Sequence, residues 1–312
     1  MQIRRREQIG IALEEAAGTA VAPTHNLPFL EMTLEEKHEP FADNQGRGRR
    51  YKEGENSIEG RKSAEGKISC VLDPDTAPYW LAMALGSIES AANDESGQAG
   101  YKHTIVLTDE NDPQTATIWR DRKVDQVEYT NCVCSSLEIS FSDDLAKVSA
   151  DIKAKFPTTQ ARSIAEVPLK YYTFRNASVS FGDGGLQVRD FSIKIENDAE
   201  MIYGPNSSVV DKIAVKSAKV SGSFKLLFEN ETMKDQFFNF NKDSLSLILT
   251  GDDGSSISIN LPKVRIDKWG TEGGLDDLVK EGLDFVAEYD TDSDAAITCE
   301  VVNSVANYKS ES

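Results

Sequence analysis

Two stretches of this chain repeat the same order of hydrophobic patterns. Within residues 221–261, apolar residues first alternate with polar ones, then gather on one side of a short segment, and then alternate again around a glycine-containing turn. Alternation with a period of two predicts a strand, whereas apolar residues three to four positions apart predict a helix. Residues 66–119 follow the same order, with the short helix expected over 76–85. This repeated order indicates a duplicated unit.

Hairpins are expected on both sides of each repeated unit. In the first half, apolar residues alternate over 127–141 and again over 148–156, around a Ser-Asp-Asp turn. The second half opens with a hairpin that turns at 182–185, and a last hairpin, turning at 291–294, is expected to mirror the one in the first half. We therefore expect a mostly β protein of two tandem β-barrel or β-sandwich modules, each with a short flanking α-helix.

Polar stretches between these patterns divide the chain. Residues 1–26 have no strong periodicity and are expected to form an N-terminal arm. The first module is expected over 27–157 and includes a long polar loop, 35–65. Residues 158–168 are a short polar linker, and the second module is expected over 169–312.

The loop expected over 35–65 is unusual because basic residues stand in it among acids and glycines. The basic residues are Arg47, Arg49, Arg50, Arg61 and Lys62. Glu53, Glu55 and Glu59 are interleaved with them, which argues against a nucleic-acid surface. We expect instead a loop that becomes ordered against an acidic neighbour.

The overall charge restricts the classes of partner. Because 34 Lys and Arg face 52 Asp and Glu, the formal net charge is −18, and the chain should repel nucleic acid rather than hold it. The basic start, Met1–Arg6, has no apolar region behind it, so no secretory signal is expected. No run approaches the roughly 18 apolar residues of a membrane span. The four cysteines are expected to be buried, reduced thiols of a protein made in the cytoplasm.

No arrangement of residues indicates catalysis, a metal or a cofactor. The chain has three histidines, all in or beside polar segments, and it lacks a nucleophile elbow and a phosphate-binding loop. The glycines of 182–185 join two expected strands and are interpreted as a hairpin turn. The acidic turns at 252–253 and 290–294 do not have the spacing of an EF-hand. We therefore expect no enzyme, no metal site and no cofactor.

Several segments resemble the tail tube proteins of long-tailed, siphovirus-like bacteriophages, in the form with tandem modules. The resembling segments are Gly10–Thr24 followed by Leu27–Leu30, Gly66–Ile68 with Leu85 and Gly86 after the short helix, Phe191–Asn197, and Leu261–Val264. Each motif is loose, so the specificity of the resemblance comes from their order along nearly the whole chain.

The resemblance implies a structural virion protein of the phage tail, assembled in the host cytoplasm. In that family, β-barrel-like modules with a flanking helix form rings, which stack into a tube that conducts DNA from capsid to host. Single-module members form hexamers, and tandem-module members form trimers with pseudo-sixfold symmetry. The duplication favours trimeric rings, with hexameric rings as the alternative. The implied partners are other copies of the chain, the tape measure protein, tail terminator and tip proteins, and DNA that passes without specific binding; no membrane is implied.

Within such a tube, an acidic channel would let DNA slide because carboxylates repel phosphates. The candidate channel-facing acids lie in expected turns: Asp143, Asp144, Asp252, Asp253, Asp292 and Asp294. The basic residues of the long loop are candidates for contacts between rings. The alternative function is a β-sandwich binding module, such as an adhesin or a carbohydrate-binding domain. Against that alternative, Trp80, Trp119 and Trp269 lie in contexts typical of a core rather than of a binding platform.

Overall fold

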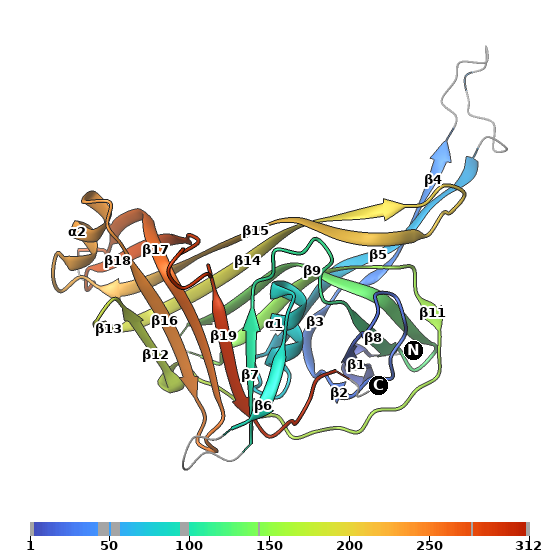
Figure 1. Ribbon diagram of the computed structural model, residues 1–312, viewed down its shortest axis with the longest axis horizontal. Helices are drawn as coiled ribbons and strands as arrows, with labels where there is room; N and C mark the ends of the chain where they lie inside the picture. The colour runs from blue at the N-terminus through green and yellow to red at the C-terminus, as the bar shows by residue number, and fades with distance from the viewer. Residues whose placement is uncertain are drawn as a thin grey trace.

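The computed structural model describes residues 3–42, 50, 57–93, 100–142, 144–275 and 277–309 (Figure 1). Over this part of the chain the protein is mostly β, with nineteen strands joined by antiparallel pairing and two α-helices. This confirms the fold class that the alternation predicts. No helix in these ranges is long and apolar enough to cross a bilayer.

The largest feature is a run of eight antiparallel strands, which we call the central sheet. Its order is β4 (Glu35–Ala42), β5 (Ser57–Val71), β10 (Lys147–Ala154), β9 (Gln126–Ser142), β14 (Val188–Tyr203), β15 (Val210–Leu227), β18 (Lys280–Ala287) and β17 (Ser256–Glu272). A short strand, β3 (Phe29–Met32), continues the line of β4 along the same edge of β5. Buried and less buried residues alternate along β10, as expected for a sheet that packs on one face.

A smaller sheet shares β9 with the central sheet. It consists of β2 (His25–Asn26), β1 (Gln8–Leu13), β8 (Ala116–Asp121), the first half of β9, and β11 (Thr158–Thr159). The N-terminal region therefore differs from the arm expected over 1–26, because β1 pairs with β8 and its Ile9, Ile11 and Leu13 are buried. A strand that is buried on both faces shows no alternation, so its pattern did not predict it.

The remaining strands extend from the two edges of β17. On one edge, β16 (Lys242–Thr250) is followed by β12 (Ala177–Phe181) and β13 (Gly184–Leu186). On the other edge, β18 pairs with the second half of β17 and β19 (Thr298–Asn303) with the first half, followed by β7 (Tyr101–Val106) and β6 (Glu89–Ala92). The prediction that the last two strands form a hairpin is therefore wrong. β18 and β19 do not pair with each other but lie end to end along β17, which is long enough to pair with both.

The range 35–65, expected as a long loop, contains β4 and the first half of β5, which pair with each other. Residues of β4 are exposed almost throughout, so polar side chains occupy both of its faces and no alternation marks it as a strand. Figure 1 shows this hairpin projecting from the body beside the outer ends of β14 and β15.

Two α-helices follow equivalent strands of the central sheet. α1 (Ala77–Leu85) follows β5, and α2 (Thr232–Phe238) follows β15; short 3₁₀ turns are found at η1 (Arg4–Arg6) and η3 (Phe174–Asn176). Because successive strands alternate in direction, β5 and β15 run the same way. Both helices therefore begin at the same end of the strands.

α1 is enclosed by its own chain: all nine of its residues are buried. The C-terminal segment after β19 closes over its first turn. There the Tyr308 hydroxyl donates to the Asp75 carbonyl at 2.8 Å. The Tyr308 ring lies edge-on, 4.8 Å from both the Tyr79 and the His103 rings. α1 thus belongs to one continuous core with strands of both halves of the chain.

His103 is fully buried in this contact. Its Nδ1 lies 2.8 Å from the Ser90 hydroxyl, and its Nε2 lies 3.0 Å from Asn303 Oδ1. The Asn303 amide donates to the Tyr308 hydroxyl at 2.6 Å. Burial lowers the pKa of His103 below its ordinary value of 6.5, so the neutral imidazole holds the C-terminal segment at neutral pH.

Candidate functional site

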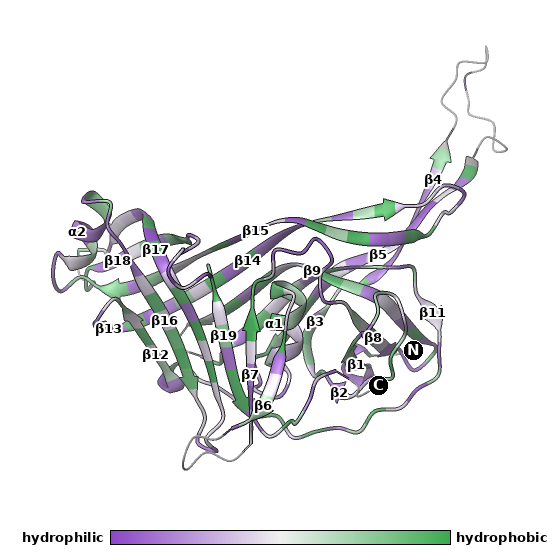
Figure 2. Ribbon diagram, viewed as in Figure 1, coloured by the Kyte–Doolittle hydropathy of each residue, from purple (hydrophilic) through white to green (hydrophobic). Residues whose placement is uncertain are grey.

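One side of the central sheet faces the core, and we call the other side the open face. Along β9, Leu137, Ile139 and Phe141 point into the core and are at most 4% exposed. The residues between them lie on the open face: Ser136, Glu138, Ser140 and Ser142. Figure 2 shows hydrophobic and hydrophilic segments alternating along β14 and β15 as well. The open face is thus a polar surface that spans strands of both halves of the chain.

Serines form a stripe across the open face. Ser69 of β5 lies opposite Ser149 of β10, with their hydroxyl oxygens 2.9 Å apart. Ser192 of β14 lies opposite Ser223 of β15 at 3.1 Å, and Ser140 of β9 is the partner of Ser192 on its other side. These hydroxyls present short, uncharged groups to whatever lies against the face.

Three lysines on the open face are paired with carboxylates, whereas Lys67, Lys153 and Lys219 on the same face have no ion pair among the described residues. The pairs are Lys194 with Glu196 at 2.6 Å, Lys225 with Glu272 at 2.9 Å, and Lys268 with Asp284 at 3.0 Å. The hydrogen bond to Glu196 raises the pKa of Lys194, which keeps its charge in the pair. Each of the three paired lysines must give up an ion pair before it can bind another anion.

The central sheet has two free edges. One is formed by β3 and β4, which pair only with β5 among the described strands. The other is the end of β17, because pairing with β16 stops at Arg265 and no other described strand pairs with residues 266–272 on that side. Exposed strand edges present unpaired N–H and C=O groups, so they are templates for pairing with another chain.

The chain matches the model of one protein family, described as phage tail tube protein, over residues 4–301. The match covers both sheets, both helices and the open face. This chain belongs to the phage tail tube protein family. The resemblance inferred from the sequence is thereby confirmed. No curated protein matches the chain.

The structure places one predicted channel acid of this tail tube protein on the open face. Asp144 lies after β9 and lines a groove of about 510 Å³ that also contains Ser142, Asp190 and Ser192. Its carboxylate lies 3.3 Å from Lys147 Nζ, and a backbone hydrogen bond from Leu145 together with this lysine lowers its pKa. Asp143 lies outside the described residues.

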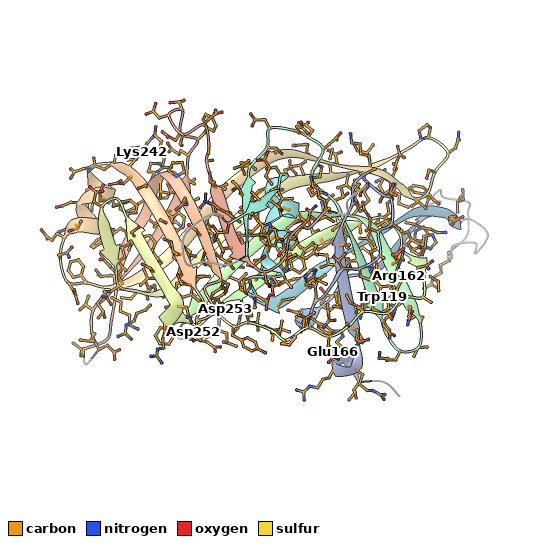
Figure 3. All side chains as sticks on the ribbon, turned by 60° about the horizontal axis from the view of Figure 1, so that its bottom comes forward. Trp119, Arg162, Glu166, Lys242, Asp252 and Asp253 are labelled. Carbon is orange, nitrogen blue, oxygen red and sulfur yellow. The ribbon has the colours of Figure 1, made fainter. Side chains whose placement is uncertain are left out.

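Asp252 and Asp253 lie in the turn between β16 and β17, where Figure 3 shows them side by side. Lys170 bridges Asp253 at 3.2 Å to Asp75 at 3.3 Å. Hydrogen bonds from Ser255 lower the pKa of Asp253 to about 2. Asp253 therefore fixes its own turn to the segment before η3, whereas Asp252 is exposed.

The third predicted pair lies apart from these turns. Asp292 and Asp294 are in the loop between β18 and β19, opposite the middle of β17. Asp294 has a positive φ of 55° and accepts a hydrogen bond from the Tyr289 hydroxyl. The six predicted acids therefore do not form a single cluster within the described residues.

Basic residues of the predicted long loop attach one hairpin to another. The Arg61 guanidinium lies 4.9 Å from the centre of the Tyr203 ring, and Lys62 Nζ lies 5.9 Å from that of Phe156. The Lys62 amide also donates to the Ser208 carbonyl at 2.7 Å. The contacts with Tyr203 and Ser208 hold β5 against the outer ends of β14 and β15, and the contact with Phe156 holds it against the segment after β10. Arg50 is exposed, and Arg47 and Arg49 lie outside the described residues.

Within the described ranges, no group of three or more His, Cys, Asp or Glu could hold a metal ion. The four cysteines are buried, and burial raises the pKa of Cys70 to about 12, so this thiol is unreactive. The sequence pattern did not single out the open face as one continuous surface. The sequence feature that marks this face is the serines at alternate positions of its strands. That pattern is also typical of the polar side of any half-buried strand.

Proposed function

We propose that this tail tube protein assembles into rings that stack into the phage tail tube, and that DNA passes through the central channel. The observation that carries the proposal is the direction of the two free edges. The central sheet has eight alternating strands, so its first strand, β4, and its last, β17, run antiparallel. Pairing residues 266–272 with the β3–β4 edge of a neighbouring copy therefore continues the same antiparallel ladder and covers both edges.

A ring closed in this way contains the central sheet of each copy in one barrel. We propose that the halves 27–157 and 169–312 are tandem modules that each contribute one long strand followed by a helix, β5–α1 and β15–α2. Three copies would then give a pseudo-sixfold ring, and a ring of six copies is the alternative. The symmetry of the ring, threefold or sixfold, distinguishes the two. The closed interface is heterologous, since two different edges meet.

The open face is the proposed channel wall. Its serines are uncharged, and Lys194, Lys225 and Lys268 are held by carboxylates, which leaves Lys67, Lys153 and Lys219 as the open-face lysines without an ion pair among the described residues. Protein–DNA affinity comes largely from free cations that displace counterions, so paired lysines favour sliding over retention. Asp144 adds a carboxylate where the wall ends. We also propose that the turns with Asp252, Asp253, Asp292 and Asp294 place further carboxylates around the channel.

Two projecting hairpins are the proposed contacts between stacked rings. β4–β5 and β14–β15 extend past the body together (Figure 1), and Arg61 and Lys62 join them. The tape measure protein within the tube, and terminator and tip proteins at its ends, are the further proposed partners. The role of the chain is structural and not enzymatic.

Electron microscopy of the concentrated, purified chain tests this proposal. We expect tubes of stacked rings with a central channel, whose threefold or sixfold symmetry gives the number of copies. Monodisperse monomers under conditions of assembly, or rings whose channel is lined by α1 rather than by the open face, would contradict it.

A further inference from the structure

α2 carries an aromatic surface that its own chain leaves uncovered. Phe238 is 66% exposed and Phe240 is 65% exposed, whereas Met233 is the one residue of α2 that is buried. Phe237 packs on Phe238 at 5.1 Å, and Phe238 lies 6.2 Å from Trp269 of β17. We call residues 229–240 the α2 knob. Clustered exposed aromatics of this kind mark protein interfaces.

A cleft of about 680 Å³ lies at the opposite edge of the central sheet, beside β3. Its exposed apolar residues include Leu30 at 58%, Tyr171 at 55% and Val167 at 45%. Arg4 and Arg5 also line it, and Arg5 has no ion-pair partner among the described residues. The cleft therefore combines an apolar floor with a rim that carries Arg4 and Arg5 together with the exposed Glu166.

The α2 knob and the cleft lie on the same side of the central sheet. They also lie at the same end of its strands. The knob is on the core side of the sheet, because Trp269 beneath it is the partner of the buried Leu283. The cleft is on the core side too, since residues of β1 and β2 line it. Figure 3 shows that Lys242, just after the knob, and Glu166, in the cleft, are far apart in one copy. One copy therefore cannot join them.

We infer that the α2 knob of each copy docks in the cleft of the next copy around the ring; this inference rests on the proposed ring assembly. When 266–272 of one copy pairs with the β3–β4 edge of the next, the knob beside β17 meets the cleft beside β3. The charges favour the same pairing. Glu229 and Asp235 of the knob are exposed and have no ion-pair partner among the described residues, and they would face the arginines of the cleft.

Cysteine cross-linking in assembled tubes tests the contact. The double variant Leu30→Cys, Phe238→Cys, treated with a short bismaleimide, should give a denaturation-resistant ladder that ends at the number of copies in one ring. The native cysteines are buried and will not compete. The matched control is Val106→Cys, Phe238→Cys, because Val106 is 37% exposed but lies in β7, which does not line the cleft. We expect no ladder from the control.

A charge exchange gives a second, independent measurement. Arg4→Glu with Arg5→Glu, and separately Glu229→Arg with Asp235→Arg, should each raise the concentration needed for assembly roughly tenfold, and the four changes together should restore it. Tubes that form normally but show no specific ladder and no response to these charges would overturn the docking while leaving the proposed function intact. Failure of the unaltered chain to form tubes would overturn both.

Discussion

The two helices of this protein occupy matching places and have opposite environments. α1 follows β5 and has all nine residues buried, whereas α2 follows β15 and buries only Met233. β9 and β7 pack on α1, and the far end of the chain adds Tyr308 and Asn303, which donate hydrogen bonds to the carbonyls of Asp75 and Pro74 just before its first turn. α2 has no equivalent cover within the described residues. Within one copy, residues of the second half therefore help to bury α1. The exposed residues of α2 are left to be covered by the proposed neighbouring copy.

The largest effect should separate the two helices in the free subunit. Leu81→Ala in α1 removes a fully buried side chain, so the free energy of unfolding should fall by about 2–5 kcal/mol. Phe238→Ala in α2 is the matched control and should change it by less than about 0.5 kcal/mol, because that ring is exposed in one copy. Denaturant titration of monomeric protein measures both. Equal losses would show that α2 is already covered.

The next effect concerns the C-terminal cover of α1. Tyr308→Phe keeps the ring but removes the hydroxyl that donates to the Asp75 carbonyl and accepts from the Asn303 amide. Two buried polar groups are left without this partner, so stability should fall by about 1–3 kcal/mol. Tyr289→Phe is a control, since Tyr289 is 55% exposed. If both variants unfold at the same denaturant concentration, the hydroxyl does not hold the cover.

Acid should loosen the same cover. Burial holds the pKa of His103 below 6.5, so the unfolded chain binds the proton more readily than the folded chain does. The contribution to stability is therefore complete above pH 6.5 and is lost as pH falls through the window below it, by at most about 1.4 kcal/mol per pH unit. Burial lowers the pKa of His25 as well, which adds to the effect. His103→Gln should flatten this part of the profile, and an unchanged slope would assign it to other groups.

The smallest expected effect on stability belongs to the ion pairs of the open face. Replacing Glu196, Glu272 and Asp284 by their amides frees three lysines and should cost only about 0–1 kcal/mol per pair. Retention of DNA should nevertheless rise, and the slope of log affinity against log salt should steepen by about 0.9 for each lysine that contacts a phosphate. Filter binding of DNA to assembled tubes at several salt concentrations measures it. An unchanged slope would mean that these lysines do not face the channel.

Alternation predicted the elements that pack on one side only. The expected helix 76–85 corresponds to α1. The pattern failed for two strands for opposite reasons. β1 is buried on both faces and is nearly all apolar, whereas β4 is exposed on both faces and is mainly polar. Neither strand alternates.

Pairing partners and the functional surface were harder to predict. The local pattern placed strands at β18 and β19 but could not show that both pair with β17, because register depends on residues far apart in the chain. The acids proposed for the channel were chosen by charge and turn position, and the structure disperses them. The serines of the open face carry no charge, so only the sheet that aligns Ser69 with Ser149 makes them recognisable as one surface.

Hydrogen exchange of free and assembled protein tests the closure of the sheet most directly. In the free subunit the amides at the outer edge of β3 and β4 and those within 266–272 should exchange quickly, since no described strand pairs with them there. In tubes the same two segments should become protected together, whereas the exposed turn around Val124 should exchange at an unchanged rate. Protection of neither segment in well-formed tubes would contradict the account.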